Sequence, residues 1–264
     1  MIDLHCHILC GLDDGAEDME ASIAMARLAY DDGIRTIVAT PHGVSFGGLW
    51  RSGCSVEETA ERVTELCEEL SANGLAGLGI MGGVENYIEP QLAKRFDEGS
   101  AFTLAGTRYI LVELPFQSYP AFTDQALFEL QARGLVPIIA HPERNLSMQR
   151  QPQLLERLVE RGMMTQVTAA SLLGTYGSTT RKAAEEFLLR GLAQVIASDA
   201  HGTENQRGPA LSPGVAAAQR LVGEERAWAM VTTTPEAILA DERPDAVPVA
   251  SVTSRRRWVP WRRR

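Results

Sequence analysis

HCHILCGLDDG, residues 5–15, begins at the end of the first predicted strand of the chain, Ile2–His5. Two histidines flank a cysteine, a second cysteine follows, and two aspartates close the stretch. These residue types fit a reactive thiol, a disulfide or part of a metal site. Polar side chains directly after a strand recur along the rest of the chain, and this recurrence decides both the fold and the choice among the three sites.

Strand-like and helix-like segments alternate from this point onward. Glycines such as Gly33, Gly134 and Gly191 stand where predicted helices end, a position that favours a left-handed backbone. About seven strand-helix units, with no Gly-rich dinucleotide motif after the first strand, favour a closed α/β barrel over a doubly wound sheet. The predicted strands are Ile2–His5, Thr36–Thr40, Leu78–Gly83, Arg108–Leu114, Val136–His141, Met163–Thr168 and Gln194–Ser198. The predicted helices are Met19–Asp32, Val56–Ser71, Thr123–Arg133, Gln153–Arg161, Thr180–Arg190, Pro213–Leu221 and Thr234–Leu239.

Length and composition predict one barrel-sized domain. The chain has 264 residues, of which 45% are hydrophobic and 22% charged, enough for one sizeable core. Pro, Ala, Ser and charged residues dominate from about Ala240, so we expect the domain to cover residues 1–243 and a flexible linker with a basic Arg/Trp tail to cover 244–264. Because no leader pattern or apolar span is present, we expect a cytoplasmic protein.

The cysteines do not support a thiol site. Four cysteines in a chain of 264 residues, in an expected reducing compartment, argue against a disulfide framework. Cysteine-dependent phosphatases need an arginine six residues after the nucleophile, and no cysteine of this chain has one. A serine nucleophile is no better supported, since no G-x-S-x-G elbow is present.

The charge of the chain is unevenly distributed. The last fourteen residues, SVTSRRRWVPWRRR, hold six arginines and no acid, so the net charge of −9 divides into −15 for residues 1–250 and +6 for the tail. An acidic body of this kind repels nucleic acid. The tail predicts either a solvated terminus or a peripheral contact with an anionic membrane, in which the arginines attract the lipid and Trp258 and Trp261 enter its interface.

All five histidines come at the end of a predicted strand or directly after one. In a barrel of parallel strands these positions meet at the carboxyl-terminal rim, although they are far apart in sequence. Three acids share this placement. The set is His5 and His7 after the first strand, His42 after the second, Glu85 after the third, Glu113 at the end of the fourth, His141 after the fifth, and Asp199 and His201 after the seventh.

Any one of these side chains alone could equally be a capped or ion-paired residue. Together, imidazoles and carboxylates without a comparable number of Lys or Arg form a costly cluster of charge unless a cation neutralises it. Imidazole with carboxylate suits Zn, Mn or Fe, and several acids able to bridge suggest two or three ions. Cys6 should point away from His5 and His7 and pack behind the site, with Cys10 in the following loop.

The ordered motifs resemble those of the polymerase-and-histidinol-phosphatase (PHP) superfamily. They are HCH with Asp14 downstream, TPH at 40–42, GGVEN, VELP, AHPER and SDAH. DDGAED, HPER and SDAHGTENQRGP are similar, more narrowly, to the CpsB/YwqE-type bacterial protein-tyrosine phosphatases of capsule and exopolysaccharide systems. Each motif is short, but the ordered set is specific and extends from Met1 to about Leu239.

The resemblance implies a single-domain, distorted (β/α)7 TIM-like barrel with a trinuclear metal site, commonly manganese, with iron or zinc as alternatives. It implies that Arg144 and Arg207 grip the phosphoryl oxygens, with Asp14 or His201 as proton donor. The implied ligand sets are His5, His7, Glu113 and Asp199 for one ion, Glu85, Glu113 and His141 for a second, and Asp14, His42 and His201 for a third, with Glu113 bridging.

Two departures from the family pattern affect this expectation. Thr168 stands where the family usually has asparagine, which leaves the polar group of that strand open. The spacing from His201 to Arg207 varies among family members, so the role of Arg207 is less secure than that of Arg144.

The expected reaction is attack of a metal-bridged hydroxide on phosphorus, without a phosphoenzyme, because a water shared by two cations loses its proton near neutral pH. The expected substrate is phosphotyrosine on a protein, in particular a tyrosine autokinase of polysaccharide export. Two alternatives stay open: a histidinol-phosphate phosphatase of the same superfamily, and a non-catalytic metal-binding regulatory protein. The complete ligand set disfavours the second, and the DDGAED and SDAHGTENQRGP stretches disfavour the first.

Overall fold

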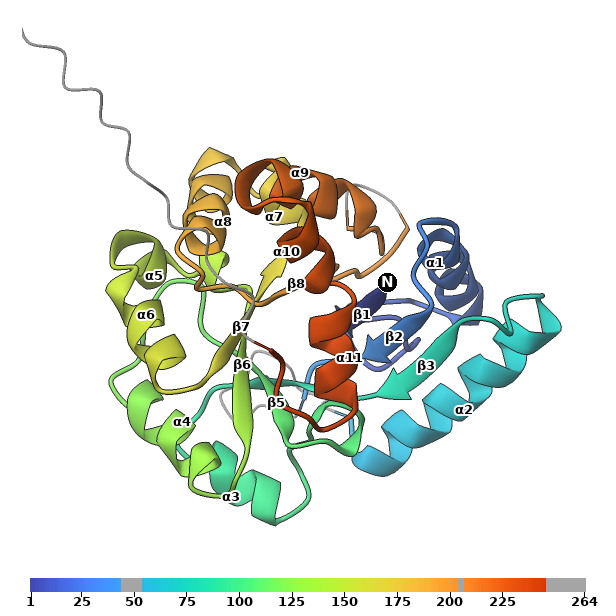
Figure 1. The fold of residues 1–264 in the computed structure, drawn as a ribbon. Coiled ribbons are helices and arrows are strands. Elements are labelled where there is room, and N and C mark those ends of the chain that lie inside the picture. The colour runs from blue at the N-terminus through green and yellow to red at the C-terminus, as the bar shows by residue number, and fades with distance from the viewer. Residues whose placement is uncertain (44–53, 204–206, 246–264) are drawn as a thin grey trace, which may run out of the picture.

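A computed structural model describes residues 1–43, 54–203 and 207–245 of the chain. Its described part contains eight strands, all paired in parallel, in two sheets of order β1-β2-β3 and β4-β5-β6-β7-β8. Helices surround the strands on the outside (Figure 1). The strands are β1 (Ile2–Cys6), β2 (Thr36–Ala39), β3 (Gly79–Gly82), β4 (Glu85–Tyr87), β5 (Tyr109–Glu113), β6 (Val136–Ala140), β7 (Met164–Thr168) and β8 (Val195–Ala197).

Two seams join these sheets into a barrel. Parallel bridges connect Cys6 to Ala200 at one seam and His42 to Glu85 at the other. At the first seam the buried Asp3 carboxylate accepts hydrogen bonds from the Ser198 amide at 3.0 Å and the Ser198 hydroxyl at 2.5 Å. The expected distorted α/β barrel in a single domain is confirmed.

The third predicted strand, Leu78–Gly83, differs from the expectation. The chain here forms two short strands, β3 pairing with β2 and β4 pairing with β5. Gly83 lies between them, and a Cβ at this position would come within 3.0 Å of both Leu104 and Val38. Glycine fits this close approach, and the chain changes sheets here, with Glu85 beginning a strand of its own.

The predicted helices are present, with ends shifted by at most a few residues. Several short helices occur where the sequence gave no sustained period, among them α3, α5, α7 and α10. The helices are α1 (Met19–Asp31), α2 (Val56–Ala72), α3 (Leu92–Asp97), α4 (Thr123–Gln131), α5 (Leu146–Arg150), α6 (Gln153–Glu160), α7 (Ala169–Leu173), α8 (Ser178–Leu189), α9 (Ser212–Val222), α10 (Glu224–Ala229) and α11 (Thr233–Leu239), with 3-10 turns η1 (Leu104–Gly106) and η2 (Pro142–Arg144).

The apolar side chains form two cores. A large one lies between the strands and the outer helices, and it contains Cys6, as expected from the sequence. A smaller one fills the barrel and includes Ile238 of α11, the helix that lies across the strands in Figure 1. Because α11 closes the amino-terminal end of the barrel, the opposite rim is left for polar chemistry. The inner core contains Leu4, Val38, Leu104, Tyr109, Leu111, Ile138, Ala140, Met164, Val195 and Ile238.

In the described part of the chain, no helix combines the length and the apolar character needed to cross a bilayer. The last described contacts of the body involve Asp241, which pairs with Arg108 at 3.0 Å, and Glu242, whose carbonyl accepts the Tyr109 hydroxyl. The domain boundary near residue 243 stays a prediction, since the tail lies outside the described residues.

Candidate metal centre

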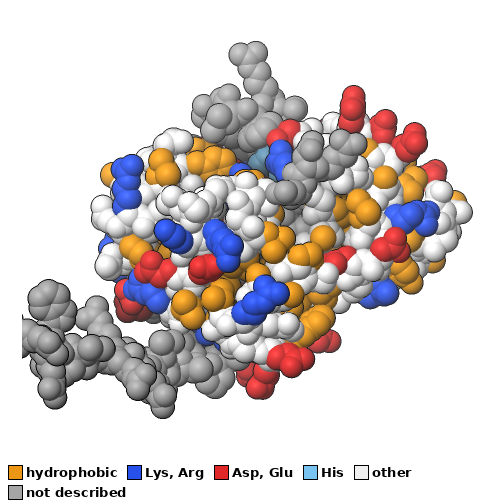
Figure 2. Space-filling model, turned by 90° about the horizontal axis from the view of Figure 1, so that it is seen from above, with side chains coloured by type: hydrophobic (Ala, Val, Ile, Leu, Met, Phe, Trp, Pro, Cys, Tyr) orange, Lys and Arg blue, Asp and Glu red, His pale blue; other side chains and the backbone are white. Residues whose placement is uncertain are grey.

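The five histidines come together at the carboxyl-terminal rim of the barrel. The rings of His7 and His201 stack with centroids 3.8 Å apart, and the His7 and His42 centroids are 4.6 Å apart. His5 and His141 continue the cluster, with ring centroids 5.7 Å apart. In the space-filling view, histidine surface lies in a recess with basic and acidic side chains beside it (Figure 2). Sequence positions almost two hundred residues apart thus meet in one place.

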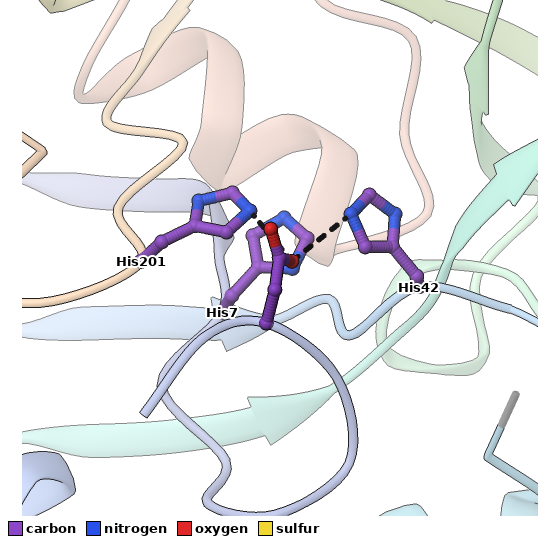
Figure 3. A group of neighbouring side chains, drawn as sticks. His7, His42 and His201 are labelled. Atoms are coloured by element: carbon purple, nitrogen blue, oxygen red, sulfur yellow. Dashed lines mark ion pairs between the residues drawn. The ribbon is translucent and has the colours of Figure 1, made fainter. Parts of the chain in front are cut away.

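Asp14 joins the histidines at the outer side of this cluster. Its Oδ1 atom lies 3.5 Å from His42 Nε2 and 3.3 Å from His201 Nε2, the two ion pairs dashed in Figure 3. Burial by itself raises the pKa of Asp14, but the two imidazoles hold it well below the usual range. Asp14 is therefore an ionised carboxylate, partly open to solvent, between two imidazoles.

Glu85 occupies the centre of the cluster. Its Oε2 atom is 3.4 Å from the Nε2 atoms of both His5 and His7 and 3.1 Å from His42 Nδ1. Its Oε1 atom is 2.9 Å from His141 Nε2. One buried carboxylate therefore contacts four imidazoles, an arrangement suited to a ligand shared between ions.

Glu113 and Asp199 complete the acidic set. Burial and the neighbouring Glu85 raise the pKa of Glu113 to about 8, as expected for carboxylates crowded without a cation. Asp199 Oδ1 lies 3.5 Å from His5 Nε2. Both acids sit directly at or after a strand end, where the sequence predicted them.

The relative orientation of the His5 and His7 rings tests whether a cation fits between them. Their Nε2 atoms are 3.1 Å apart, while His5 Nδ1 lies 3.0 Å from Gln166 Oε1 and His7 Nδ1 lies 2.7 Å from Asp13 Oδ2. With both Nδ1 atoms beside an oxygen, the two Nε2 atoms are left facing each other, and each can offer a lone pair only when its ring is neutral, as in a complex with a cation. Burial by itself lowers the pKa of His7, but the neighbouring Asp13 and Glu85 carboxylates raise this pKa to about 9. The site favours positive charge at this point, and a divalent ion fits the donor set.

The donor atoms form four overlapping groups, each with all atoms within 4.8 Å. All nine predicted metal ligands belong to at least one group. The expected ligand sets of the three ions stay a prediction. Among the donor atoms themselves, Glu85 contacts His5 and His7, and Glu113 groups with His42 and Glu85. The groups are His7, Asp14, His42 and His201; His5, His141 and Asp199; His5, His7 and Glu85; and His42, Glu85 and Glu113.

The sequence reasoning missed the residues that orient these ligands. Asp13 accepts from the His42 amide at 2.8 Å as well as from His7, and Gln166 of β7 contacts His5 from beyond β8, the strand that meets β1 at the seam. Gly15 permits the tight loop, because a Cβ there would lie 2.1 Å from the His7 carbonyl oxygen. The DDG stretch drew attention to Asp13, although nothing in the sequence predicted its contact with His7. Gln166 could have been found from its inward-facing position on the strand β7.

Arg144 points into the same cavity as the ligands. Its Nη1 donates to Asp199 Oδ2 at 2.6 Å, and its guanidinium lies between the rings of Phe116 and Tyr176, 4.5 and 4.6 Å from their centroids. Arg207 lines this cavity too, and its carbonyl accepts from the His201 amide at 3.1 Å. The cavity has a volume of about 350 Å³, enough for a phosphoryl group and a ring.

Local backbone geometry places Arg144 beside the metal ligands. His141 adopts a left-handed conformation with φ of 31°, and the Arg144 amide donates to its carbonyl at 2.9 Å in the turn η2. Glu143 in this turn is fully buried and binds the Thr168 amide at 2.9 Å and the Ser171 hydroxyl at 2.7 Å. The Thr168 hydroxyl has no hydrogen-bond partner within the described residues. Thr168 therefore contacts Glu143 through its backbone amide, and the contribution of its side chain stays open.

Comparison with known proteins agrees with this geometry. The family described as "Capsular polysaccharide synthesis, CpsB/CapC" matches residues 1–240. The chain belongs to the CpsB/CapC family. It is 39% identical to the tyrosine-protein phosphatase YwqE of Bacillus subtilis over 209 residues, 78% of this chain and 79% of YwqE. It is 35% identical to the putative tyrosine-protein phosphatase CapC of Staphylococcus aureus over 206 residues, 78% of this chain and 79% of CapC.

A solved structure of the CpsB/CapC family shares the fold. It comes from crystal structures of YwqE from Bacillus subtilis and CpsB from Streptococcus pneumoniae, described as metal-dependent tyrosine phosphatases. The match has a TM-score of 0.86 and 34% identity, and it covers 94% of this chain and 100% of the solved chain. The family membership predicted from the motifs is confirmed over nearly the whole barrel.

Proposed function

We propose that this chain is a metal-dependent phosphatase that hydrolyses phosphotyrosine on proteins. The observation that carries the proposal is the single cavity in which imidazoles and carboxylates of metal-binding type face two arginines. The names of the relatives support a tyrosine phosphatase linked to capsule synthesis. The proposed natural substrate is a bacterial tyrosine autokinase that controls capsule or exopolysaccharide synthesis.

The proposed cofactor is a set of two or three divalent ions, Mn²⁺ first and Fe or Zn as alternatives, because the donor set is imidazole and carboxylate without thiolate. Glu85 is the proposed central ligand, since it contacts four imidazoles. Bound divalent ions would lower the pKa of a coordinated water and polarise the phosphoryl oxygens. The proposed ligands are His5, His7, Asp14, His42, Glu85, Glu113, His141, Asp199 and His201.

The residues of the chain have separate roles in this proposal. Arg144 and Arg207 would bind the phosphoryl oxygens, because a planar guanidinium can donate two hydrogen bonds to one phosphate. Asp199 and the two rings beside Arg144 hold its guanidinium in place before substrate arrives. Asp14 and His201 are the two proposed proton donors to the leaving phenolate. The two imidazoles hold the pKa of Asp14 well below its usual range and burial lowers the pKa of His201, so neither shift favours one donor over the other.

One experiment distinguishes the competing functions. Purified protein with Mn²⁺ should release phosphate from a phosphotyrosine peptide much faster than from histidinol phosphate. Chelation should abolish the activity and added Mn²⁺ should restore it, whereas iodoacetamide should leave it intact, because the exposed Cys67 lies away from the cavity and burial raises the pKa of the Cys54 thiol. Preference for histidinol phosphate, inactivation by iodoacetamide alone, or bound metal without turnover would each refute the proposal.

A peripheral membrane contact through the Arg/Trp tail is a further part of the proposal, supported by composition alone. Six arginines contribute about 1 kcal/mol each near an anionic leaflet, against a body that the same surface repels. The full chain should sediment with anionic vesicles at low salt and be released at high salt, while a chain ending at Ala250 should not sediment. Equal sedimentation of the full and the shortened chain would refute a membrane contact through the tail.

A further inference from the structure

A second cavity lies at the end of the barrel opposite the metal centre. Its volume is about 770 Å³, within the range of small-molecule sites. Residues at the starts of four strands line it: Tyr109 of β5, Val136 of β6, Met164 of β7, and Gln194 just before β8. The metal centre takes its ligands from the other ends of β5, β6 and β8. The two cavities are therefore separated by the length of these strands.

Arg226 of α10 is the unusual residue of this cavity. It lines the cavity, it is only 8% exposed, and it forms no ion pair or side-chain hydrogen bond with any described residue. Burial lowers its pKa, and no carboxylate opposes this effect. The guanidinium nitrogens are open to the cavity, so this unpaired positive charge is available to an anion that enters it.

The other charges of the cavity are already balanced or exposed. Arg108 pairs with Asp241 at 3.0 Å, and Arg161 pairs with Asp124 at 2.8 Å. Glu160, Arg243 and Asp245 also line the cavity, but all three are exposed to solvent. Arg226 is thus the unpaired lining charge that is mostly buried, and an incoming anion would meet it there.

The remaining wall is apolar. Met163 and Met230 are almost fully buried, and Val136 and Val159 are partly buried beside them. Methionine side chains adapt to ligands of irregular shape. A ligand whose anionic group contacts Arg226 would therefore pack its remaining atoms against these apolar side chains.

We propose that this cavity is a second ligand site, which binds a small amphipathic organic anion. A phosphate, sulfonate or carboxylate group contacts Arg226, and an apolar body packs on the methionine and valine side chains. The site is independent of the metal centre, because the two share no residue.

A matched pair of fluorescent probes tests the site in the full-length protein. 1-Anilinonaphthalene-8-sulfonate carries a sulfonate on an aromatic body, and N-phenyl-1-naphthylamine has the same body without the charge. The sulfonate should bind to the wild type at least about tenfold more tightly than the neutral probe, since a hydrogen bond to a charged group contributes on that scale. Equal binding of the two probes, or no binding of the sulfonate, would refute the anion site.

Variants locate the bound probe. Arg226→Met should weaken sulfonate binding about tenfold or more. Arg220→Met, which removes an exposed arginine from the neighbouring helix α9, should bind like the wild type. Arg144→Met should also bind normally, because Arg144 lines the other cavity. Unchanged binding in Arg226→Met, or lost binding in Arg144→Met, would overturn the assignment.

A second variant decides the question if Arg226→Met does not fold. Val159→Trp fills the cavity from the partly buried face of α6 and leaves Arg226 in place. It should abolish sulfonate binding while phosphotyrosine hydrolysis by the manganese-loaded enzyme continues. Sulfonate binding that survives in Val159→Trp would refute the site.

Discussion

At the scale of single residues, Arg144 shows how this chain prepares a charge for a substrate. The guanidinium is held by Asp199 and enclosed by Phe116 and Tyr176, so it loses little freedom when a phosphoryl group arrives. The sequence predicted the residue from the HPER motif, but it could not predict the two rings. Phe116 follows β5 and Tyr176 follows α7, and only the closed barrel brings them to either side of Arg144.

Arg144→Ala should lower kcat/KM for a phosphotyrosine peptide by about 30-fold to 1000-fold, equivalent to about 2–4 kcal/mol of transition-state stabilisation. Bound metal, measured by elemental analysis, should not change, since Arg144 is not a ligand. Arg220→Ala serves as the control for loss of an arginine and should retain full activity. Normal turnover in Arg144→Ala would show that the phosphoryl group is held elsewhere.

Tyr109 gives a prediction about pH and stability. Burial raises its pKa above the usual value, and its hydroxyl donates to the Glu242 carbonyl at 2.5 Å. The unfolded chain ionises first, so the stability that Tyr109 contributes is complete below pH about 10 and is lost as pH rises through the folded-state pKa. Urea unfolding of the wild type and Tyr109→Phe should therefore converge as pH rises above 10. A difference that is constant up to pH 11 would contradict this.

At the scale of elements, the turn η2 is tied to the next strand by one buried acid. Glu143 binds the amide of Thr168 at the end of β7 and the hydroxyl of Ser171 in α7. His141 and Arg144 flank Glu143, so this link fixes a proposed ligand and a proposed phosphate-binding residue together. Glu143 is a positioning residue in this arrangement, since it faces away from the cavity.

Glu143→Ala should lower the free energy of unfolding by about 2–3 kcal/mol, because the Thr168 amide and Ser171 hydroxyl lose their buried acceptor. It should also raise KM for the phosphotyrosine peptide, because Arg144 is less well held. Glu143→Gln keeps an oxygen acceptor and should recover most of both losses. A Glu143→Ala variant with wild-type stability and KM would show that the turn η2 keeps its conformation without the Glu143 hydrogen bonds.

Sequence reasoning succeeded for elements with a clear pattern, including the short α11 and β8, and missed short helices without one. Helices such as α2 show a sustained period and a capping box at Ser55 and Glu58, and were predicted within two residues. The short helices α7 and α10 have five and six residues, too few for a period to be visible. The split into β3 and β4 occurs at Gly83, which packs closely against Leu104 and Val38, and such tertiary contacts are not visible in a local sequence pattern.

At the scale of the whole molecule, the barrel explains why the site could be predicted at all. Polar residues recur in the sequence directly after the strands. Because the strands of a barrel are parallel, these residues all lie at the same rim. The gathering of the histidines and acids followed from that arrangement. The contacts among them did not follow from it, because the central place of Glu85 depends on β4 leaving the first sheet, and Gln166 of β7 reaches His5 past β8, at the seam between β8 and β1.

The central claim is that the rim side chains form a divalent metal centre that depends on Glu85. Its most direct test is the Mn²⁺ content of chelator-stripped protein, reloaded with Mn²⁺ and desalted, measured by elemental analysis for the wild type, Glu85→Gln and Glu160→Gln. Glu160 is an exposed acid on α6, so its variant controls for loss of a carboxylate. The wild type and Glu160→Gln should retain two or three ions per chain and Glu85→Gln at least one fewer. Retention of no ion by the wild type, or equal retention by all three proteins, would contradict the claim.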